Sequence, residues 1–185
     1  MTFPSGNFSF PFTESEMPIR YGRYMLLKRR NVDAVGEEFL AARGVDDGVD
    51  QLRIVRGIYP ELASESQFVG LFSEEARTLS RLASDNVVRV DETGSVADIP
   101  FVATEYVEGV TLERLLALAR ALDQKCPWEL AAYISAELLR GLDYVHRRED
   151  ILGKPMGMRH GDVRPANVII SYEGEVKLTN FSSTL

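Results

Sequence analysis

The sequence contains very little cysteine and no long apolar run, and both absences limit what the protein can be. Cys126 is the only cysteine in 185 residues, which excludes an internal disulfide and favours a reducing, cytoplasmic location. No apolar run approaches the roughly 20 residues that a membrane-spanning helix needs. The N-terminus also lacks the basic stretch and apolar core of a signal peptide. These features predict a protein without a membrane span.

Basic residues are outnumbered by acidic ones, 21 against 28, which gives a net charge of −7. A general binder of nucleic acid or of anionic membranes needs a basic face, so the charge argues against both partners. Hydrophobic residues make up 45% of the chain, which indicates a globular protein with one core or two small lobes. Residues 1–18 hold three prolines and four phenylalanines. They predict a flexible arm that either docks on a surface or simply leads into the fold.

Strand patterns dominate the first half of the chain beyond this arm. Alternating and β-branched runs predict five strands, at residues 21–30, 37–43, 51–58, 86–91 and 101–106. Apolar residues at helical spacing predict one helix between the third and fourth strands, at residues 66–82.

Gly109 ends the strand pattern, and helices follow. Apolar spacing predicts a short helix at 111–122 and a longer one at 128–147, which Pro127 opens. The long helix carries an apolar stripe: Leu130, Tyr133, Ile134, Ala136, Leu138, Leu142 and Val145. A strand pair around a turn is predicted at 168–171 and 176–178.

The most specific motif lies near the C-terminal end of the sequence. His160, Asp162 and Asn167 have the spacing H-x-D-x-x-x-x-N, and Asn180-Phe181-Ser182 follows. The catalytic loop of protein kinases has the same spacing and is followed by Asp-Phe-Gly. From about Tyr21 to Leu185, the chain therefore resembles the protein kinase family. The run E-Y-V-E-G-V-T-L and the insert G-K-P-M-G make it similar to the bacterial Ser/Thr kinases.

The resemblance implies an α+β fold. Residues 19–108 would form a kinase-like small lobe, a five-stranded antiparallel sheet plus one helix. Residues 109–185 would form an incomplete helical large lobe with two helices, the catalytic-loop remnant and a β-hairpin. A full kinase continues with a helical layer that covers the helix at 128–147. We therefore expect another protein chain or a second copy to cover the Trp128–Arg147 helix face, unless the chain is a fragment of a longer protein.

The resemblance also assigns roles to the motif residues. Asp162 takes the place of the catalytic base, and Asn167 that of a metal ligand. Asn180 stands where the family has the aspartate that holds magnesium on the nucleotide phosphates. Magnesium beside phosphates prefers carboxylate, and an amide offers only a neutral oxygen. We therefore interpret Asp162 and Asn167 as vestigial, and the metal site of Asn167 and Asn180 as unoccupied.

The nucleotide-binding positions implied by the resemblance are degenerate. They are Gly36, Arg56, Glu75, Glu105 and Val107. Gly36 alone remains of the glycine-rich loop that admits phosphates, and Asp33 would place a negative charge beside them. Arg56 replaces the phosphate-binding lysine, and an ion pair with Glu75 is favoured over a phosphate contact. The backbone of Glu105 and Val107 matches the hinge that binds adenine.

The sequence therefore predicts a catalytically inactive kinase-like scaffold or regulatory subunit that acts through protein–protein contacts and needs no cofactor. Two alternatives stay open. One is a weak or atypical Ser/Thr phosphotransferase that depends on ATP and magnesium and uses Asp162 and Asn167. The other is a module that senses nucleotides without turnover.

Overall fold

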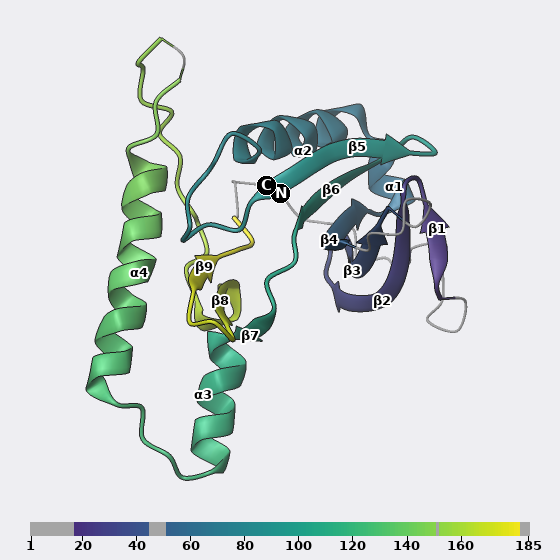
Figure 1. Ribbon diagram of the computed structural model, residues 1–185. Helices are drawn as coiled ribbons and strands as arrows, with labels where there is room; N and C mark the ends of the chain where they lie inside the picture. The colour runs from purple at the N-terminus through teal and green to yellow at the C-terminus, as the bar shows by residue number, and fades with distance from the viewer. Residues whose placement is uncertain (1–16, 45–50, 151, 182–185) are drawn as a thin grey trace. The chain divides into compact units, whose positions relative to one another are not determined.

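The computed structural model describes residues 17–44, 51–150 and 152–181 (Figure 1). The chain divides into two compact units. The first comprises Met1–Arg81 and Arg89–Tyr106, and the second comprises Leu82–Val88 and Val107–Leu185. Most of the predicted N-terminal arm lies outside the described residues, as does Ser182.

The first unit is built on a six-stranded antiparallel sheet of order β1-β2-β3-β4-β6-β5 (Figure 1). The strands are β1 (Ile19–Tyr21), β2 (Tyr24–Val32), β3 (Gly36–Arg43), β4 (Gln51–Ile58), β5 (Val90–Val96) and β6 (Ile99–Glu105). Two tight turns define the hairpins at its ends. Gly22 has a φ of 59° between β1 and β2, and Ala97 and Asp98 have φ of 50° and 64° between β5 and β6. In the β5–β6 turn both central residues, Ala97 and Asp98, have positive φ, which matches the twist of a two-residue hairpin.

A core of aromatic and aliphatic side chains fills one face of this sheet. The Phe101 ring makes edge contacts with Tyr21 and Tyr24, at centroid distances of 5.7 and 5.8 Å. Burial raises the pKa of both tyrosines to about 12. Two helices, α1 (Pro60–Ala63) and α2 (Ser66–Leu79), bury Leu62 and Phe72 against Ile58 in a second cluster.

The structure corrects three predictions for this unit. The sheet has six strands instead of five, because the turn at Gly22 separates β1 from β2. Two helices follow β4 instead of one. The strand predicted at 86–91 is wrong in its first half, since residues 86–88 belong to the second unit. Val88 is buried there, and its N–H donates to the carbonyl of Leu178 at 2.8 Å.

The second unit combines two long helices with a three-stranded sheet of order β7-β8-β9. Its elements are β7 (Gly109–Thr111), α3 (Leu112–Ala121), α4 (Trp128–His146), the 3₁₀ turn η2 (Pro165–Asn167), β8 (Val168–Ser171) and β9 (Val176–Leu178). The Thr111 side chain caps α3 by accepting the N–H of Arg114. Pro127, which the sequence placed at the opening of this helix, is the N-cap of α4, and the helix itself begins at Trp128.

Gly109 begins a strand, whereas the sequence predicted only a break there and a two-stranded hairpin beyond it. β7 pairs with β8, with Gly109 opposite Ser171. A Cβ at Gly109 would lie 2.1 Å from the carbonyl oxygen of Ile170. The close approach of the two backbones therefore requires glycine at this position.

Helix α4 has a buried face and an exposed one. Ile134, Gly141 and Val145 are buried, and Ile134 packs with Leu178 of β9 in the core of this unit. The predicted apolar stripe is therefore divided, because only part of it faces this core. On the outward side, the side chains of Trp128 and Leu139 are 76% and 63% exposed.

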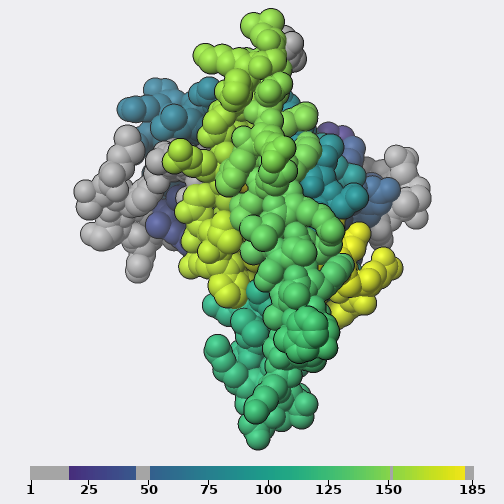
Figure 2. Space-filling model, turned by 90° about the vertical axis from the view of Figure 1, so that its left-hand side faces the viewer, coloured from purple at the N-terminus to yellow at the C-terminus, as the bar shows by residue number. Residues whose placement is uncertain are grey.

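Figure 2 shows α4, in green, running along the surface of its unit. Among the residues that the structure describes, no helix combines the length and apolar character of a membrane span.

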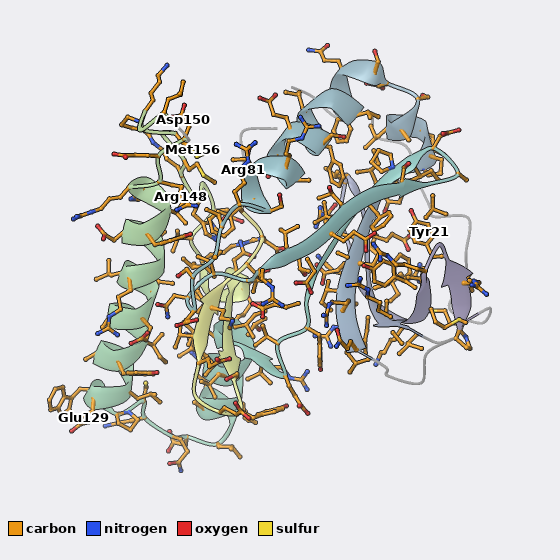
Figure 3. The ribbon with its side chains drawn as sticks, turned by 45° about the horizontal axis from the view of Figure 1, so that its top comes forward. Tyr21, Arg81, Glu129, Arg148, Asp150 and Met156 are labelled. Carbon is orange, nitrogen blue, oxygen red and sulfur yellow. The ribbon has the colours of Figure 1, made fainter. Side chains whose placement is uncertain are left out.

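The segment after α4 folds back on itself before the catalytic-loop motif. Met156 donates its N–H to the carbonyl of Arg148 at 2.8 Å, and Asp150 donates to Lys154 at 2.9 Å. Figure 3 shows Arg148, Asp150 and Met156 close together beyond the end of α4. The chain then continues from this loop to His160.

Candidate active site

The predicted site residues fall on both units. They lie at the start of β3 (Gly36), on β4 (Arg56), on α2 (Glu75), at the end of β6 (Glu105), just before β7 (Val107), in the loop before η2 (Asp162), at the end of η2 (Asn167) and after β9 (Asn180). Glu105 belongs to the first unit and Val107 to the second.

His160 anchors the catalytic-loop motif from within the core of the second unit. Its side chain is 1% exposed, and its Nδ1 accepts the N–H of Asp162 at 3.3 Å. Nε2 therefore carries the proton and donates to the carbonyl of Thr179 at 3.0 Å. The ring also packs on Phe181, with 4.5 Å between centroids. These contacts tie the loop before η2 to the segment after β9.

Burial lowers the pKa of His160, against the raising effects of the Thr179 carbonyl and the Asp162 carboxylate. The imidazole is therefore neutral at neutral pH, which agrees with its one-donor, one-acceptor bonding. His160 holds structure and is not available as a general base.

The pKa of His160 predicts how stability depends on pH. The folded protein resists protonation of this side chain, whereas the unfolded chain takes the proton near pH 6.5. The stability that neutral His160 contributes should therefore fall as pH drops below about 6.5. We expect urea unfolding at about pH 5.5 to show a larger loss relative to about pH 7.5 in the wild type than in His160→Gln. An equal loss in both proteins would contradict this assignment.

Asn167 is the centre of a hydrogen-bond network and is 2% exposed. Its Nδ2 donates to the backbone oxygen of Asp162 at 2.9 Å and to Oδ2 of the same residue at 2.8 Å. Its Oδ1 accepts Nδ2–H of Asn180 at 3.2 Å. Its backbone oxygen accepts the N–H of Thr179 at 3.0 Å. Every polar group of the Asn167 side chain therefore has a protein partner.

Asp162 also has internal partners. Its Oδ2 lies 2.9 Å from Nε of Arg164, and the side chain is 42% exposed. The carboxylate that would receive a substrate proton is thus shared between a guanidinium and the Asn167 amide.

The residues present do not fit the magnesium that the family implies. The two ligand positions, Asn167 and Asn180, are amides that hydrogen-bond to each other. Asn180 has a φ of 55°, a left-handed conformation that asparagine tolerates. Within the described parts of the chain, no three acidic, histidine or cysteine side chains gather as a metal-binding group.

The first unit holds the positions that the sequence assigned to nucleotide phosphates. Arg56 pairs with Asp33, at 2.6 Å between Nη2 and Oδ2, whereas the sequence favoured Glu75 as its partner. Glu105 accepts the N–H of Arg89 through its carboxylate and donates its own N–H to the Arg89 carbonyl. Sequence reasoning marked Asp33 as an unfavourable charge but missed its pairing with Arg56.

Two further residues that hold the second unit together around the motif were not found from the sequence. Asn86 donates through Nδ2 to Glu137 of α4 at 2.8 Å and to the carbonyl of Val176 at 3.0 Å. Thr179 bonds both His160 and Asn167 through its backbone. No sequence signal marks a residue that acts through its backbone, so Thr179 could not have been predicted.

Comparisons with known proteins identify relatives of this arrangement. The model of the protein kinase domain family matches residues 57–184. The tyrosine-protein kinase MasK of Myxococcus xanthus is 29% identical over 161 residues, which cover 87% of this chain and 25% of that protein. The serine/threonine-protein kinase PrkC of Bacillus subtilis is 27% identical over 160 residues, which cover 86% of this chain and 22% of that protein. The chain thus spans about a quarter of the length of these relatives.

The fold agrees with a solved kinase structure. The kinase domain of PknI from Mycobacterium tuberculosis superposes with a TM-score of 0.66 at 24% identity. The match covers 90% of this chain and 63% of that one. The likeness confirms the predicted α+β kinase-like fold with a sheet-rich first unit. Because the family model matches more than half of this chain, the chain belongs to the protein kinase domain family.

Proposed function

We propose that this chain is a catalytically inactive kinase-like module that serves as a scaffold or regulatory subunit. The hydrogen bond from Asn180 Nδ2 to Asn167 Oδ1 carries the proposal. In active kinases the residue equivalent to Asn180 is an aspartate, and its carboxylate holds magnesium on the nucleotide phosphates. Here an amide N–H donor faces the oxygen that would be the other metal ligand.

Binding of magnesium would require this network to be rebuilt. Asn180 would have to turn its oxygen towards Asn167, and the hydrogen bond between them would be lost. The rebuilt site would still offer two neutral oxygens where magnesium beside phosphates prefers carboxylate. Without the metal, the charge that develops during phosphoryl transfer lacks its main stabilisation.

The proposal predicts that the purified chain transfers no γ-phosphate from labelled ATP to itself or to a generic protein substrate with magnesium present. ATP should leave the melting temperature unchanged with and without magnesium. A shift without magnesium would favour the nucleotide-sensing alternative. A magnesium-dependent shift with label transfer would overturn the proposal in favour of an atypical phosphotransferase.

Asn180→Asp is the matched variant for this test. It changes one amide into a carboxylate of nearly the same size and supplies the missing charged ligand. We expect any magnesium dependence of the ATP shift to appear in Asn180→Asp and not in the wild type. An identical response of both proteins would show that position 180 is not the missing element.

The outward face of α4 is the surface that we propose for the scaffold role. Trp128 and Leu139 expose large apolar side chains on this face, and such exposure marks an interaction surface when it is contiguous. We expect another protein chain or a second copy of this chain to cover this face of α4. Sedimentation of the wild type and of the Trp128→Ser, Leu139→Ser double variant tests self-association. Equal monomer masses for both would exclude a second copy as the cover.

A further inference from the structure

Helix α4 carries its acidic and basic side chains in opposite halves. Residues 128–137 contain two glutamates and no lysine or arginine. Residues 138–148, which run just past the end of the helix, contain three arginines and one aspartate. Figure 3 labels Glu129 and Arg148 at opposite ends of α4. The helix therefore has an acidic half and a basic half.

Glu129 and Arg147 lie at the two ends of a line along the outward side of α4. Eighteen residues separate them, which is about five turns at 3.6 residues per turn, so they lie on the same side of the helix. Both side chains are exposed, and so are those of Ala132 and Ala136 between them. The buried residues of α4 lie on the opposite side. A flat second helix could therefore lie along this line.

Two large apolar side chains flank the same line. Trp128 lies next to Glu129 at the acidic end, and Leu139 lies one residue beyond the midpoint between Glu129 and Arg147. Both apolar side chains are mostly exposed. A two-fold axis through this midpoint would place Leu139 of one copy beside Leu139 of another.

The charges of α4 are only partly neutralised within the chain. Arg147 Nε lies 2.7 Å from Oδ1 of Asp143, and Arg140 pairs with Glu137. Glu129 has no ion-pair partner in the part of the chain that the structure describes. The acidic end of α4 thus presents a carboxylate that is free to pair with another molecule.

We propose that a second copy of this chain covers the outward face of α4, with the two helices antiparallel and Glu129 of each copy opposite Arg147 of the other. An antiparallel pair places the acidic half of each helix on the basic half of the other, and the two-fold symmetry repeats this match at both ends. A parallel pair would place like charges together. The helix dipoles also favour the antiparallel orientation.

The self-complementary charge pattern is what selects a second copy as the cover. A face that binds an unrelated protein needs to match that protein and has no requirement to match itself. Exposed ion pairs contribute little energy, so the apolar side chains supply most of the contact and the charges set orientation and register. The inference rests on the proposed scaffold function and names the partner for its surface.

Cross-linking of full-length chains tests the orientation. Glu129→Cys and Arg147→Cys are each made with Cys126→Ser, which removes the exposed native thiol. When the two variants are mixed, a short bismaleimide should join residue 129 of one to residue 147 of the other. It should not join Glu129→Cys to itself, because two residues 129 would lie about 27 Å apart along the antiparallel helices.

Charge reversal tests the pairing. Glu129→Arg and Arg147→Glu should each raise the dissociation constant of the dimer about tenfold at low salt, as measured by sedimentation equilibrium. The two reversals in one chain should return the constant to within about threefold of the wild type. Glu113→Arg on α3 is the control, because it makes the same charge change at an exposed position off α4 and should leave the constant unchanged.

Three results would overturn the inference: a wild type that stays monomeric at millimolar concentration, links between two copies of Glu129→Cys, or single reversals that leave the dissociation constant unchanged. If a reversal variant fails to fold, the cross-linking decides. These experiments contain no nucleotide or metal, so their failure leaves the catalytic proposal standing. Transfer of phosphate from ATP would overturn that proposal and leave the dimer unaffected.

Discussion

Replacement of Asn167 by aspartate is expected to lower the free energy of unfolding by about 3 kcal/mol or more, the range for a buried charge left without a partner. The variant loses both hydrogen bonds from Nδ2 to Asp162. It also places a second carboxylate beside Asp162 Oδ2, where Nδ2 now lies at 2.8 Å. Urea unfolding at neutral pH measures the loss.

Asn180→Gly is the control for this variant. It removes only the 3.2 Å bond to Asn167, and glycine suits the φ of 55° at this position. We expect a loss of about 1 kcal/mol or less. If Asn167→Asp were as stable as the wild type, or if magnesium restored its stability, Asn167 would be a metal ligand and not a structural centre.

Gly109→Ala is expected to destabilise the second unit by about 3 kcal/mol, at the upper end for overpacking. The new methyl group would lie 2.1 Å from the Ile170 oxygen and 2.7 Å from the Cα of Ser171. Both are backbone atoms of β8, so β7 must separate from β8. Denaturant unfolding followed by circular dichroism measures the effect.

Gly70→Ala provides the comparison within a helix. Nothing lies within 4 Å of a Cβ built at Gly70, which is in the interior of α2. Alanine there should stabilise the helix by up to about 1 kcal/mol. A Gly109→Ala variant with wild-type stability would contradict the close backbone contact between β7 and β8.

Elements with a strong local pattern were predicted from the sequence. The strands at 51–58, 168–171 and 176–178 have the predicted bounds, because each alternates or is β-branched between clear turn residues. The helix at 111–122 is confirmed as α3 to within one residue at each end, with Thr111 as its cap.

Elements defined by distant partners were not predicted. β5 has the sequence V-D-E-T-G-S-V, whose polar centre has no strand pattern, and it exists because β6 pairs with it. Val87 and Val88 have strand-like side chains, yet their backbone partner is Leu178, about ninety residues further along the chain. Pairing across such a distance cannot be read from local periodicity.

In the candidate site, too, contacts within a local motif were predicted and contacts between distant residues were not. The spacing of His160, Asp162 and Asn167 predicted which residues meet, because the motif folds within one loop. The contact between Asp33 and Arg56 joins residues 23 positions apart on different elements, so it required the structure. The sequence predicted the loss of a charge at Asn180 but not that its amide would bond the opposing ligand position.

A titration of Mn²⁺ into the wild-type chain with ATP present, followed by electron paramagnetic resonance, tests directly whether the chain holds a divalent cation on a nucleotide. Mn²⁺ has ligand preferences similar to those of magnesium and reports its own binding. We expect the spectrum of the Mn²⁺–ATP complex to stay unchanged when the protein is added. A protein-bound Mn²⁺ signal that disappears when Asn167 is replaced by alanine would contradict it.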